Sequence, residues 1–301
     1  MDAPAQSSQS VAMCDVDAAS ASMEWLDVVK DLNAGTVGGV AGIIAGHPLD
    51  TIKVRLQTEA VAGAGVVSTL REILRHEGPQ GLFKGLLSPV LSNAPINAVV
   101  FGVQGSVARS IRESTGQSTL TPAQHMIAGA AAGAVQTVFA APSEHVKIQL
   151  QVDHRRAGES SIDCGRRLLR RYGFKGLFRG WEMCLFRDVP AFGLYFYSYE
   201  VSKAYLTDGD PERETDLRLL LAGGIAGSTS WFFSQPMDVV KSCVQSQGFQ
   251  NQKTAIQLTK EHVAAEGSQF FLKGFGATML RAFPVSAVTF LVYEKTMQWM
   301  S

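Results

Sequence analysis

The feature that most constrains this chain is a short segment that occurs three times at constant spacing. Each copy has a proline, an acidic residue two positions later and a lysine three positions after that. The copies are His47–Lys53, Ala141–Lys147 and Gln235–Lys241, and their prolines lie 94 residues apart. Self-similarity at a fixed period indicates an architecture built from equivalent units. We therefore expect three units of about 94 residues each.

Other positions recur in the same register. A glutamine lies four residues after each motif lysine: Gln57, Gln151 and Gln245. A basic residue followed by glycine comes further along each unit, with the glycines at Gly85, Gly180 and Gly274. A proline follows each of these glycines ten residues later: Pro95, Pro190 and Pro284. Upstream of each proline motif there is a pair of glycines: Gly35/Gly39, Gly129/Gly133 and Gly223/Gly227.

The spacing of charged residues predicts membrane-crossing helices. Four stretches lack Asp, Glu, Lys and Arg over 18, 24, 30 and 19 residues, beginning after Asp31, Lys84, Glu113 and Arg218. A helix needs about 20 apolar residues to cross a hydrocarbon core of roughly 30 Å. Two further apolar stretches, 181–199 and 275–293, contain charges. By hydropathy alone, a soluble all-α protein with buried Ala- and Gly-rich helices remains an alternative.

Composition excludes several other classes. The 27 cationic and 27 anionic side chains balance, so no basic field for nucleic-acid binding is expected. The four cysteines are scattered without a CxxC pair, so we expect neither a disulfide framework nor a metal site. No nucleophile–base pair or phosphate loop is apparent, so we do not expect an enzyme.

The repeat predicts the architecture of each unit. A Gly-rich apolar helix ends near the first motif, a short amphipathic segment such as Ser68–Glu77 follows, and a second apolar helix begins after the basic-Gly motif. Glycines allow close helix contact in lipid, and prolines kink membrane helices. We expect six transmembrane helices in a pseudo-three-fold barrel, with the short helices on one side of the membrane. The kinks are expected at Pro48, Pro142, Pro236, Pro95, Pro190 and Pro284.

These motifs closely resemble those of the mitochondrial carrier family, over residues 28–299. The resemblance implies a monomeric, multi-pass transporter of the mitochondrial inner membrane that works by alternating access, without a cofactor and with cardiolipin as a bound lipid. The carrier repeats are expected at 28–120, 121–214 and 215–299. Residues 1–25 are rich in Ala and Ser, contain acids and lack arginine, so we expect a disordered tail rather than a cleaved transit peptide.

The resemblance also implies a gate on the matrix side. In each motif the acid and the lysine lie three residues apart, hence on one helix face. The family pairing joins Asp50 with Lys147, Glu144 with Lys241 and Asp238 with Lys53, and the glutamines Gln57, Gln151 and Gln245 bridge beneath. The alternative is three independent helix ends anchored at the interface.

Substrate recognition must lie where the repeats differ. Seven and eight residues after each motif glycine, the positions that the family uses for substrate contact hold Ser92-Asn93, Arg187-Asp188 and Arg281-Ala282. Charges near the membrane midplane are costly unless they face water, a partner or a ligand. We expect Asp188 to hold an ammonium group and Arg281 or Arg187 to hold a carboxylate, so the solute is a small zwitterion or cation. An internal Arg187–Asp188 ion pair is the alternative.

The stretch Arg187–Glu200 resembles carnitine/acylcarnitine carriers, and that is the expected function. The same arginines also occur in carriers of ornithine, lysine and arginine, so transport of basic or other amino acids, glutamate included, is the alternative. A glutamate that holds the side-chain cation in ornithine carriers aligns with Ile96, which weakens that alternative. A non-transporting tether is a third reading, disfavoured because the gate is complete.

The two gates predict a resting state. The family's cytoplasmic gate pairs an acid of one repeat with a base of another. In this sequence the paired positions are 105 with 203, 200 with 297, and 294 with 108, and none of them holds both an acid and a base. Three matrix pairs, worth about 0–1 kcal/mol each, stabilise the matrix-closed state of the empty carrier by about 1–3 kcal/mol. We expect it to rest open to the cytoplasm. A thiol introduced as Arg281→Cys should label readily from that side without substrate, and protection there would refute the bias.

Overall fold

The computed structural model describes residues 7–58, 65–117, 119–153, 159–208, 210, 213, 215–248 and 253–300. Within these residues the regular elements are helices. The first repeat holds α1 (Ser7–Thr58), α2 (Val66–His76), η1 (Pro79–Phe83) and α3 (Leu87–Thr115). The second holds α4 (Pro122–Val152), α5 (Ser161–Leu177) and α6 (Trp181–Thr207). The third holds α7 (Asp216–Ser246), α8 (Ala255–Glu266), η3 (Gly267–Leu272) and α9 (Phe275–Met300).

Local sequence signals explain several helix ends. Thr121 precedes α4, and its side chain accepts a hydrogen bond from the backbone N–H of Gln124, while Pro122 occupies the first helical position. Both features are favourable at a helix start. Thr254 caps α8 in the same way through Gln257. At the other end of α3, Gly116 adopts the left-handed conformation that commonly ends a helix.

The glycines of the three basic-Gly motifs share one conformation. Gly85, Gly180 and Gly274 have φ values of 77°, 72° and 75°, which side chains rarely tolerate. Each also lies against the following repeat in cyclic order: a Cβ at Gly85 would be 3.1 Å from the Lys147 carbonyl oxygen, and one at Gly274 would be 3.2 Å from that of Lys53. The motif therefore requires glycine both for the turn into the second helix and for contact between repeats.

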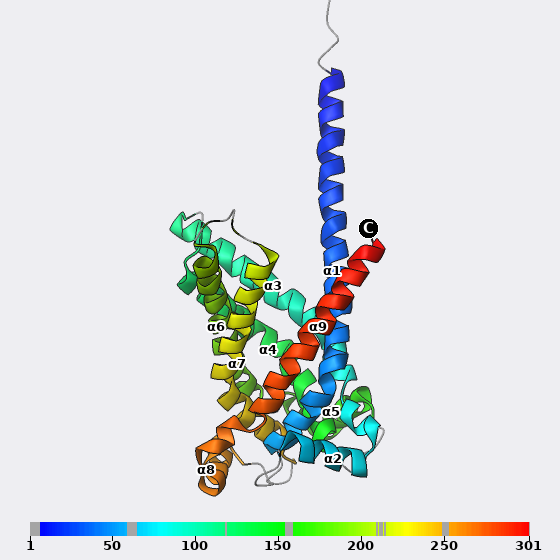
Figure 1. Ribbon diagram of the computed structural model, residues 1–301, viewed down its shortest axis with the longest axis vertical. Helices are drawn as coiled ribbons and strands as arrows, with labels where there is room; N and C mark the ends of the chain where they lie inside the picture. The colour runs from blue at the N-terminus through cyan, green and yellow to red at the C-terminus, as the bar shows by residue number, and fades with distance from the viewer. Residues whose placement is uncertain are drawn as a thin grey trace, which may run out of the picture. The chain divides into compact units, whose positions relative to one another are not determined.

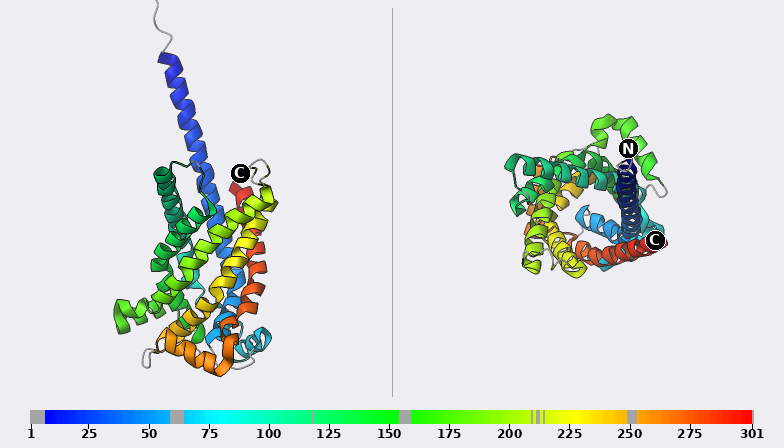
Figure 2. Two further views of the ribbon diagram at one scale, coloured as in Figure 1. Left: turned by 90° about the vertical axis from the view of Figure 1, so that its left-hand side faces the viewer. Right: turned by 90° about the horizontal axis from the view of Figure 1, so that it is seen from above.

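The chain divides into two compact parts, Gly46–Ala282 and Met1–Ala45 with Phe283–Ser301. Within Gly46–Ala282, α3 packs on α4, α4 on α6 and α6 on α7; α6 and α7 run side by side in Figures 1 and 2. The closest approach uses the paired glycines of α4: a Cβ at Gly133 would lie 2.6 Å from the Asp188 carbonyl oxygen. Absence of a side chain there lets α4 and α6 approach closely, as expected for membrane helices.

The smaller part joins the first helix to the last. A Cβ at Gly38 of α1 would lie 2.8 Å from the carbonyl oxygen of Thr289 in α9. Gly42, one turn further, faces the side chain of the same threonine. The glycine-rich face of α1 therefore serves close helix packing.

The start of the chain differs from the expected disordered tail. α1 extends back to Ser7, whereas the sequence predicts disorder over residues 1–25. The helix is continuous because no glycine or proline occurs from Ala5 to Ala34, and alanine has the highest helix propensity. Residues 1–6 of the predicted tail lie outside the described residues.

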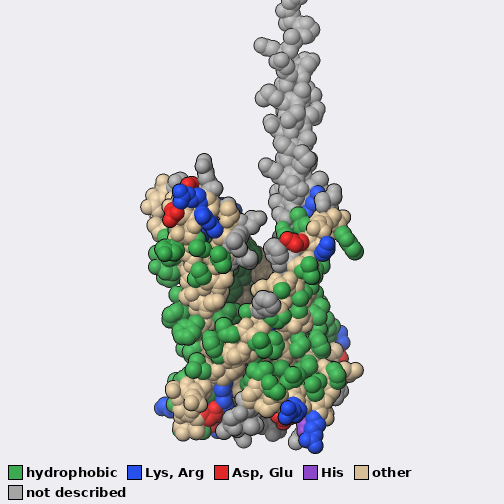
Figure 3. All heavy atoms as spheres, in the orientation of Figure 1, with side chains coloured by type: hydrophobic (Ala, Val, Ile, Leu, Met, Phe, Trp, Pro, Cys, Tyr) green, Lys and Arg blue, Asp and Glu red, His purple; other side chains and the backbone are tan. Residues whose placement is uncertain are grey.

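Hydropathy supports membrane crossing. Among the described residues, three segments are long and apolar enough to span a bilayer: Pro79–Thr115, Pro122–Val152 and Ala255–Met300. α1, α6 and α7 are the other helices expected to cross. The six prolines predicted at kinks all lie inside these long helices. On the face shown in Figure 3, hydrophobic side chains cover the middle of α6 and α7, while charged side chains gather toward the ends.

Gly133→Ala should separate α4 from α6, because the added methyl group would meet backbone atoms of Asp188. We expect a loss of about 1–3 kcal/mol in stability, seen as a lower melting temperature of the purified protein. The matched control is Gly227→Ala at the equivalent position of the third repeat, where a Cβ meets no atom within 4 Å. Equal melting temperatures of the two variants would contradict this packing.

Candidate functional site

The structure brings together the three acid–base pairs expected between repeats. Lys147 Nζ lies 2.6 Å from Asp50 Oδ2, Lys241 Nζ 2.5 Å from Glu144 Oε2, and Lys53 Nζ 2.7 Å from Asp238 Oδ2. Each pair joins one repeat to another, so the ends of α1, α4 and α7 form a closed cycle. Their side chains are between 4% and 28% exposed, so removal of one partner would leave a poorly solvated charge.

The three motif glutamines are fully buried but make different contacts. Gln57 donates to Asp238 Oδ2 at 3.1 Å, as expected for a bridge beneath an ion pair. Gln151 instead donates to the Thr51 hydroxyl, and Gln245 to the Cys184 sulfur and the Arg179 carbonyl. The repeated position therefore does not produce one repeated contact.

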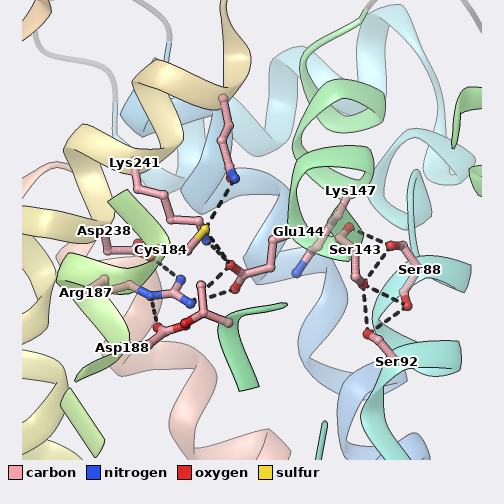
Figure 4. A network of polar contacts seen from close by, with 12 residues as sticks. Ser88, Ser92, Ser143, Glu144, Lys147, Cys184, Arg187, Asp188, Asp238 and Lys241 are labelled. Carbon is pink, nitrogen blue, oxygen red and sulfur yellow. Dashed lines mark hydrogen bonds and ion pairs between the residues drawn. The ribbon is translucent and has the colours of Figure 1, made fainter. Parts of the chain in front are cut away.

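Arg187 lies at the centre of the polar network in Figure 4. Its Nη2 is 2.9 Å from Glu144 Oε1, its Nη1 is 3.1 Å from Asp238 Oδ1, and its Nε is 2.5 Å from Asp188 Oδ1. One guanidinium thus binds the acids of two proline motifs and its neighbour in sequence. Arginine suits this role because its donors are fixed in a planar fork.

Asp188 is only 2% exposed. Besides Arg187, its carboxylate accepts hydrogen bonds from Gln136 Nε2 at 2.6 Å and Thr137 Oγ1 at 3.4 Å, both from α4. The alternative of an internal Arg187–Asp188 ion pair is therefore present in this structure. In this geometry Asp188 orients the guanidinium of Arg187, and its oxygens are occupied by protein donors.

Arg281 occupies the equivalent place in the third repeat. Its Nη1 lies 3.0 Å from Asp50 Oδ1. The ring of Trp231 lies 5.6 Å from the guanidinium carbon of Arg281 and 4.7 Å from Lys53 Nζ, distances at which a cation is attracted to an aromatic face.

The first repeat contributes neutral groups. Ser92 accepts a hydrogen bond from Ser143 Oγ at 2.8 Å and donates to the Ser88 carbonyl at 3.0 Å. Asn93 accepts a hydrogen bond from Asn97. Of these predicted contact residues, Ser92 therefore faces α4.

Sequence reasoning missed several residues of this site: Ser88, Gln136, Thr137, Ser143 and Trp231. The available signal was polarity inside charge-free stretches, since Gln136 lies within the longest such stretch. A buried polar side chain requires a hydrogen-bond partner. A search for polar residues within the apolar helices would have found them, although not their partners.

A separate pocket lies between the start of α6 and the start of α8, lined by Lys175, Arg179, Trp181, Lys253 and Thr254 among others. Burial lowers the pKa of the Arg179 guanidinium, because removal from water disfavours the charged form. The N-terminus of α8 adds backbone N–H groups. The lining holds three basic side chains and one acid, Glu182, so the pocket favours an anionic group.

The model of the mitochondrial carrier protein family matches residues 24–115, 118–210 and 213–301. The chain belongs to the mitochondrial carrier family. Three matched segments in tandem account for the 94-residue period and the all-α fold of six transmembrane helices. The family also establishes that the chain is a solute transporter of the mitochondrial inner membrane, with several membrane crossings, and not an enzyme.

Curated relatives fall into two groups. This carrier is 42% identical to the mitochondrial basic amino acids transporter of Rattus norvegicus, over 86% of each chain. It is 38% identical to a mitochondrial arginine transporter of Arabidopsis thaliana, covering 88% of this chain and 89% of the relative. It is 35% identical to the mitochondrial carnitine/acylcarnitine carrier protein of Homo sapiens, covering 91% and 95%.

Gln136→Leu should weaken the support of Asp188, because a buried carboxylate loses a short hydrogen bond. We expect a cost of about 1–3 kcal/mol, seen as a lower melting temperature together with slower transport in liposomes. Gln117→Leu is the matched control, since Gln117 is exposed. The supporting role is wrong if Gln136→Leu behaves like the control in both measurements.

Proposed function

We propose that this carrier transports a basic amino acid, of the lysine, arginine or ornithine class, by alternating access. The sequence pattern favours carnitine and acylcarnitines, with amino acids as the alternative. Among the relatives named above, identity to the basic amino acid transporters is higher, which supports the alternative over the first expectation.

The observation that carries the carboxylate part of the proposal is the arginine pair at equivalent positions of two repeats, while the higher identity to basic amino acid transporters supports the solute class. Arg187 and Arg281 lie in a network of five cationic and four anionic side chains. The cations are Lys53, Lys147, Lys241, Arg187 and Arg281, and the anions are Asp50, Glu144, Asp188 and Asp238. The excess positive charge favours a carboxylate, which arginine binds bidentately. An α-carboxylate supplies that group.

Glu144 is proposed to receive the cationic side chain. Its side chain is 28% exposed, against 12% for Asp50, 5% for Asp238 and 3% for Asp188. Of these four acids it is the one most open to a ligand. Arg187 Nη2 donates to both Glu144 oxygens, so movement of Arg187 onto the substrate carboxylate would free Oε1 and leave Oε2 bound to Lys241. This assignment replaces the expectation that Asp188 holds the ammonium group.

Carnitine remains the second candidate. It has a carboxylate for the same arginines but a quaternary ammonium, which makes no N–H hydrogen bond. The apolar Ile96, aligned with the glutamate of ornithine carriers, favours such a solute.

The three inter-repeat pairs are proposed as the matrix gate, working in a monomer, because they close the cycle of repeats without a second chain. Cardiolipin is proposed for the pocket around Arg179 and Lys253, where basic side chains meet the start of α8.

Uptake into liposomes reconstituted with the purified protein tests the proposed substrate. We expect uptake of labelled arginine or lysine that unlabelled carnitine does not inhibit. Arg281→Ala should abolish it, because the carboxylate loses its partner in a partly desolvated site.

Arg213→Ala serves as the control, because Arg213 forms an exposed ion pair with Asp208. Carnitine uptake that lysine and arginine do not inhibit would overturn the proposal in favour of the second candidate.

A further inference from the structure

One position makes the same backbone contact in all three repeats. It lies two residues after the motif lysine and holds Arg55, Gln149 and Cys243. Each side chain donates a hydrogen bond to the backbone carbonyl of the motif glutamine in the next repeat: Arg55 Nε to Gln151 at 3.1 Å, Gln149 Nε2 to Gln245 at 2.6 Å, and Cys243 Sγ to Gln57 at 3.1 Å. We call these three contacts the 1/2, 2/3 and 3/1 seams, after the repeats that they join. The acceptor is the same in each seam, but the donor is not.

Arg55 gives the 1/2 seam a charged donor. Its side chain is buried, and its Nη2 lies 2.6 Å from Glu77 Oε1. Hydrogen bonds from an ionised donor are stronger than those from a neutral one. The ion pair with Glu77 also holds the guanidinium in place, so the 1/2 seam has the strongest donor of the three.

The other two donors are neutral and unequal. The amide of Gln149 reaches two carbonyls of the third repeat, those of Gln245 at 2.6 Å and Gln247 at 3.4 Å. Cys243 has a single S–H, which is a weak donor. Its side chain lies in an apolar cluster with Leu258 and Phe270. The 3/1 seam therefore has the weakest donor.

The third repeat keeps the acid that holds the arginine of the first. Glu77 and Glu266 each precede a glycine of positive φ, so they occupy equivalent places. Glu77 binds Arg55, whereas Glu266 lies 2.7 Å from Lys273 Nζ. The weakness of the 3/1 seam thus comes from one side chain, the thiol at the place of the arginine.

Other contacts between the repeats are alike in the three seams. A Cβ on Gly85, Gly180 or Gly274 would lie 3.0–3.1 Å from the nearest atom of the next repeat. The three lysine–acid pairs have N–O distances between 2.5 and 2.7 Å. Because packing and ion pairs are so similar, the seam donors are the feature that distinguishes one interface from another.

We propose that Arg55, Gln149 and Cys243 are positioning residues that grade the three seams, and that the 3/1 seam separates first when this end of the carrier opens. Three equal lysine pairs would release all interfaces alike, whereas unequal donors give the opening an order. The order rests on the proposed matrix gate, but it does not depend on which solute is carried.

Native cysteines report on two of the seams. Cys184 is fully buried in the 2/3 seam, where its sulfur accepts from Gln245 Nε2 at 3.4 Å. Cys243 is 3% exposed and is itself the donor of the 3/1 seam. Cys164 is fully buried in a cluster with Val146 and Leu168, away from the seam contacts. It therefore reports general unfolding.

Alkylation of the purified, solute-free protein by N-ethylmaleimide, followed by peptide mass spectrometry, tests the order. Each rate is divided by that of the same thiol in protein unfolded in guanidinium, which removes differences in intrinsic reactivity. We expect Cys243 to react about fivefold faster than Cys184, the population change that goes with one neutral hydrogen bond. Cys164 should be the slowest. A rate for Cys184 equal to or above that of Cys243 overturns the proposal.

Gln149→Cys gives the 2/3 seam the donor of the 3/1 seam. We expect Cys184 to react about fivefold faster in this variant, relative to Cys164, because a weak donor replaces an amide. Gln117→Cys is the matched control, since Gln117 is exposed. An unchanged rate for Cys184 in Gln149→Cys would show that the donors do not set the strength of the seams. If the variant does not fold, the comparison within the unaltered protein still decides.

Failure of the proposed gate has a different signature. If Cys184 and Cys243 react no faster than Cys164, this end does not open through the seams, and the gate and the order are both wrong. If they react alike and faster than Cys164, the gate holds and only the order is wrong. Because no solute is added, neither result depends on the proposed substrate.

Discussion

The rest of this structure depends on the pairing of charges that lie inside membrane helices. A lysine or an aspartate within the hydrocarbon region is costly unless it meets a partner or water. Three lysines and three acids occur at one level of the repeat, and each finds its partner on another repeat. Within each motif the acid and the lysine pair with two different repeats and not with each other. The constraint therefore requires three units closing on one another.

The same pairing requires close contact between helices, which restricts residue size at the contact positions. The helices can meet at this level only where small residues permit close contact, as at Gly133 against Asp188 and at the three motif glycines. Asp50 and Asp238 each bind a lysine through one oxygen, which leaves the other oxygen for an arginine of an even helix. The residues that resemble a substrate site and the residues that resemble a gate are thus a single electrostatic network. The two sets share carboxylates, because Arg187 and Arg281 bind acids that also bind the lysines.

The three repeats do not contribute equally to this network. The lysine pairs are alike in all three repeats and carry no information about the solute. The positions seven residues after the motif glycines hold a serine and two arginines. Asp188, next to Arg187, accepts hydrogen bonds from the α4 residues Gln136 and Thr137. Buried, fully bonded groups of this kind set the direction of a guanidinium. If Arg187 binds the solute as proposed, Asp188 acts on recognition through Arg187 without facing the solute.

The sequence by itself determined the number of units and the helical class, because both follow from the repeat. The pairing of the six motif charges was expected from the family resemblance, and the structure brings each pair together. The sequence also identified Arg187 and Arg281 as exceptional, since charges are rare in apolar stretches. Only the tertiary structure decided what these side chains contact: that Asp188 is enclosed by α4, that Ser92 faces Ser143, and that Gln151 and Gln245 leave the gate acids to other donors. A repeat fixes where a residue stands along its helix, but the rotation of that helix and the shape of its neighbour decide which of several polar groups within reach becomes its partner.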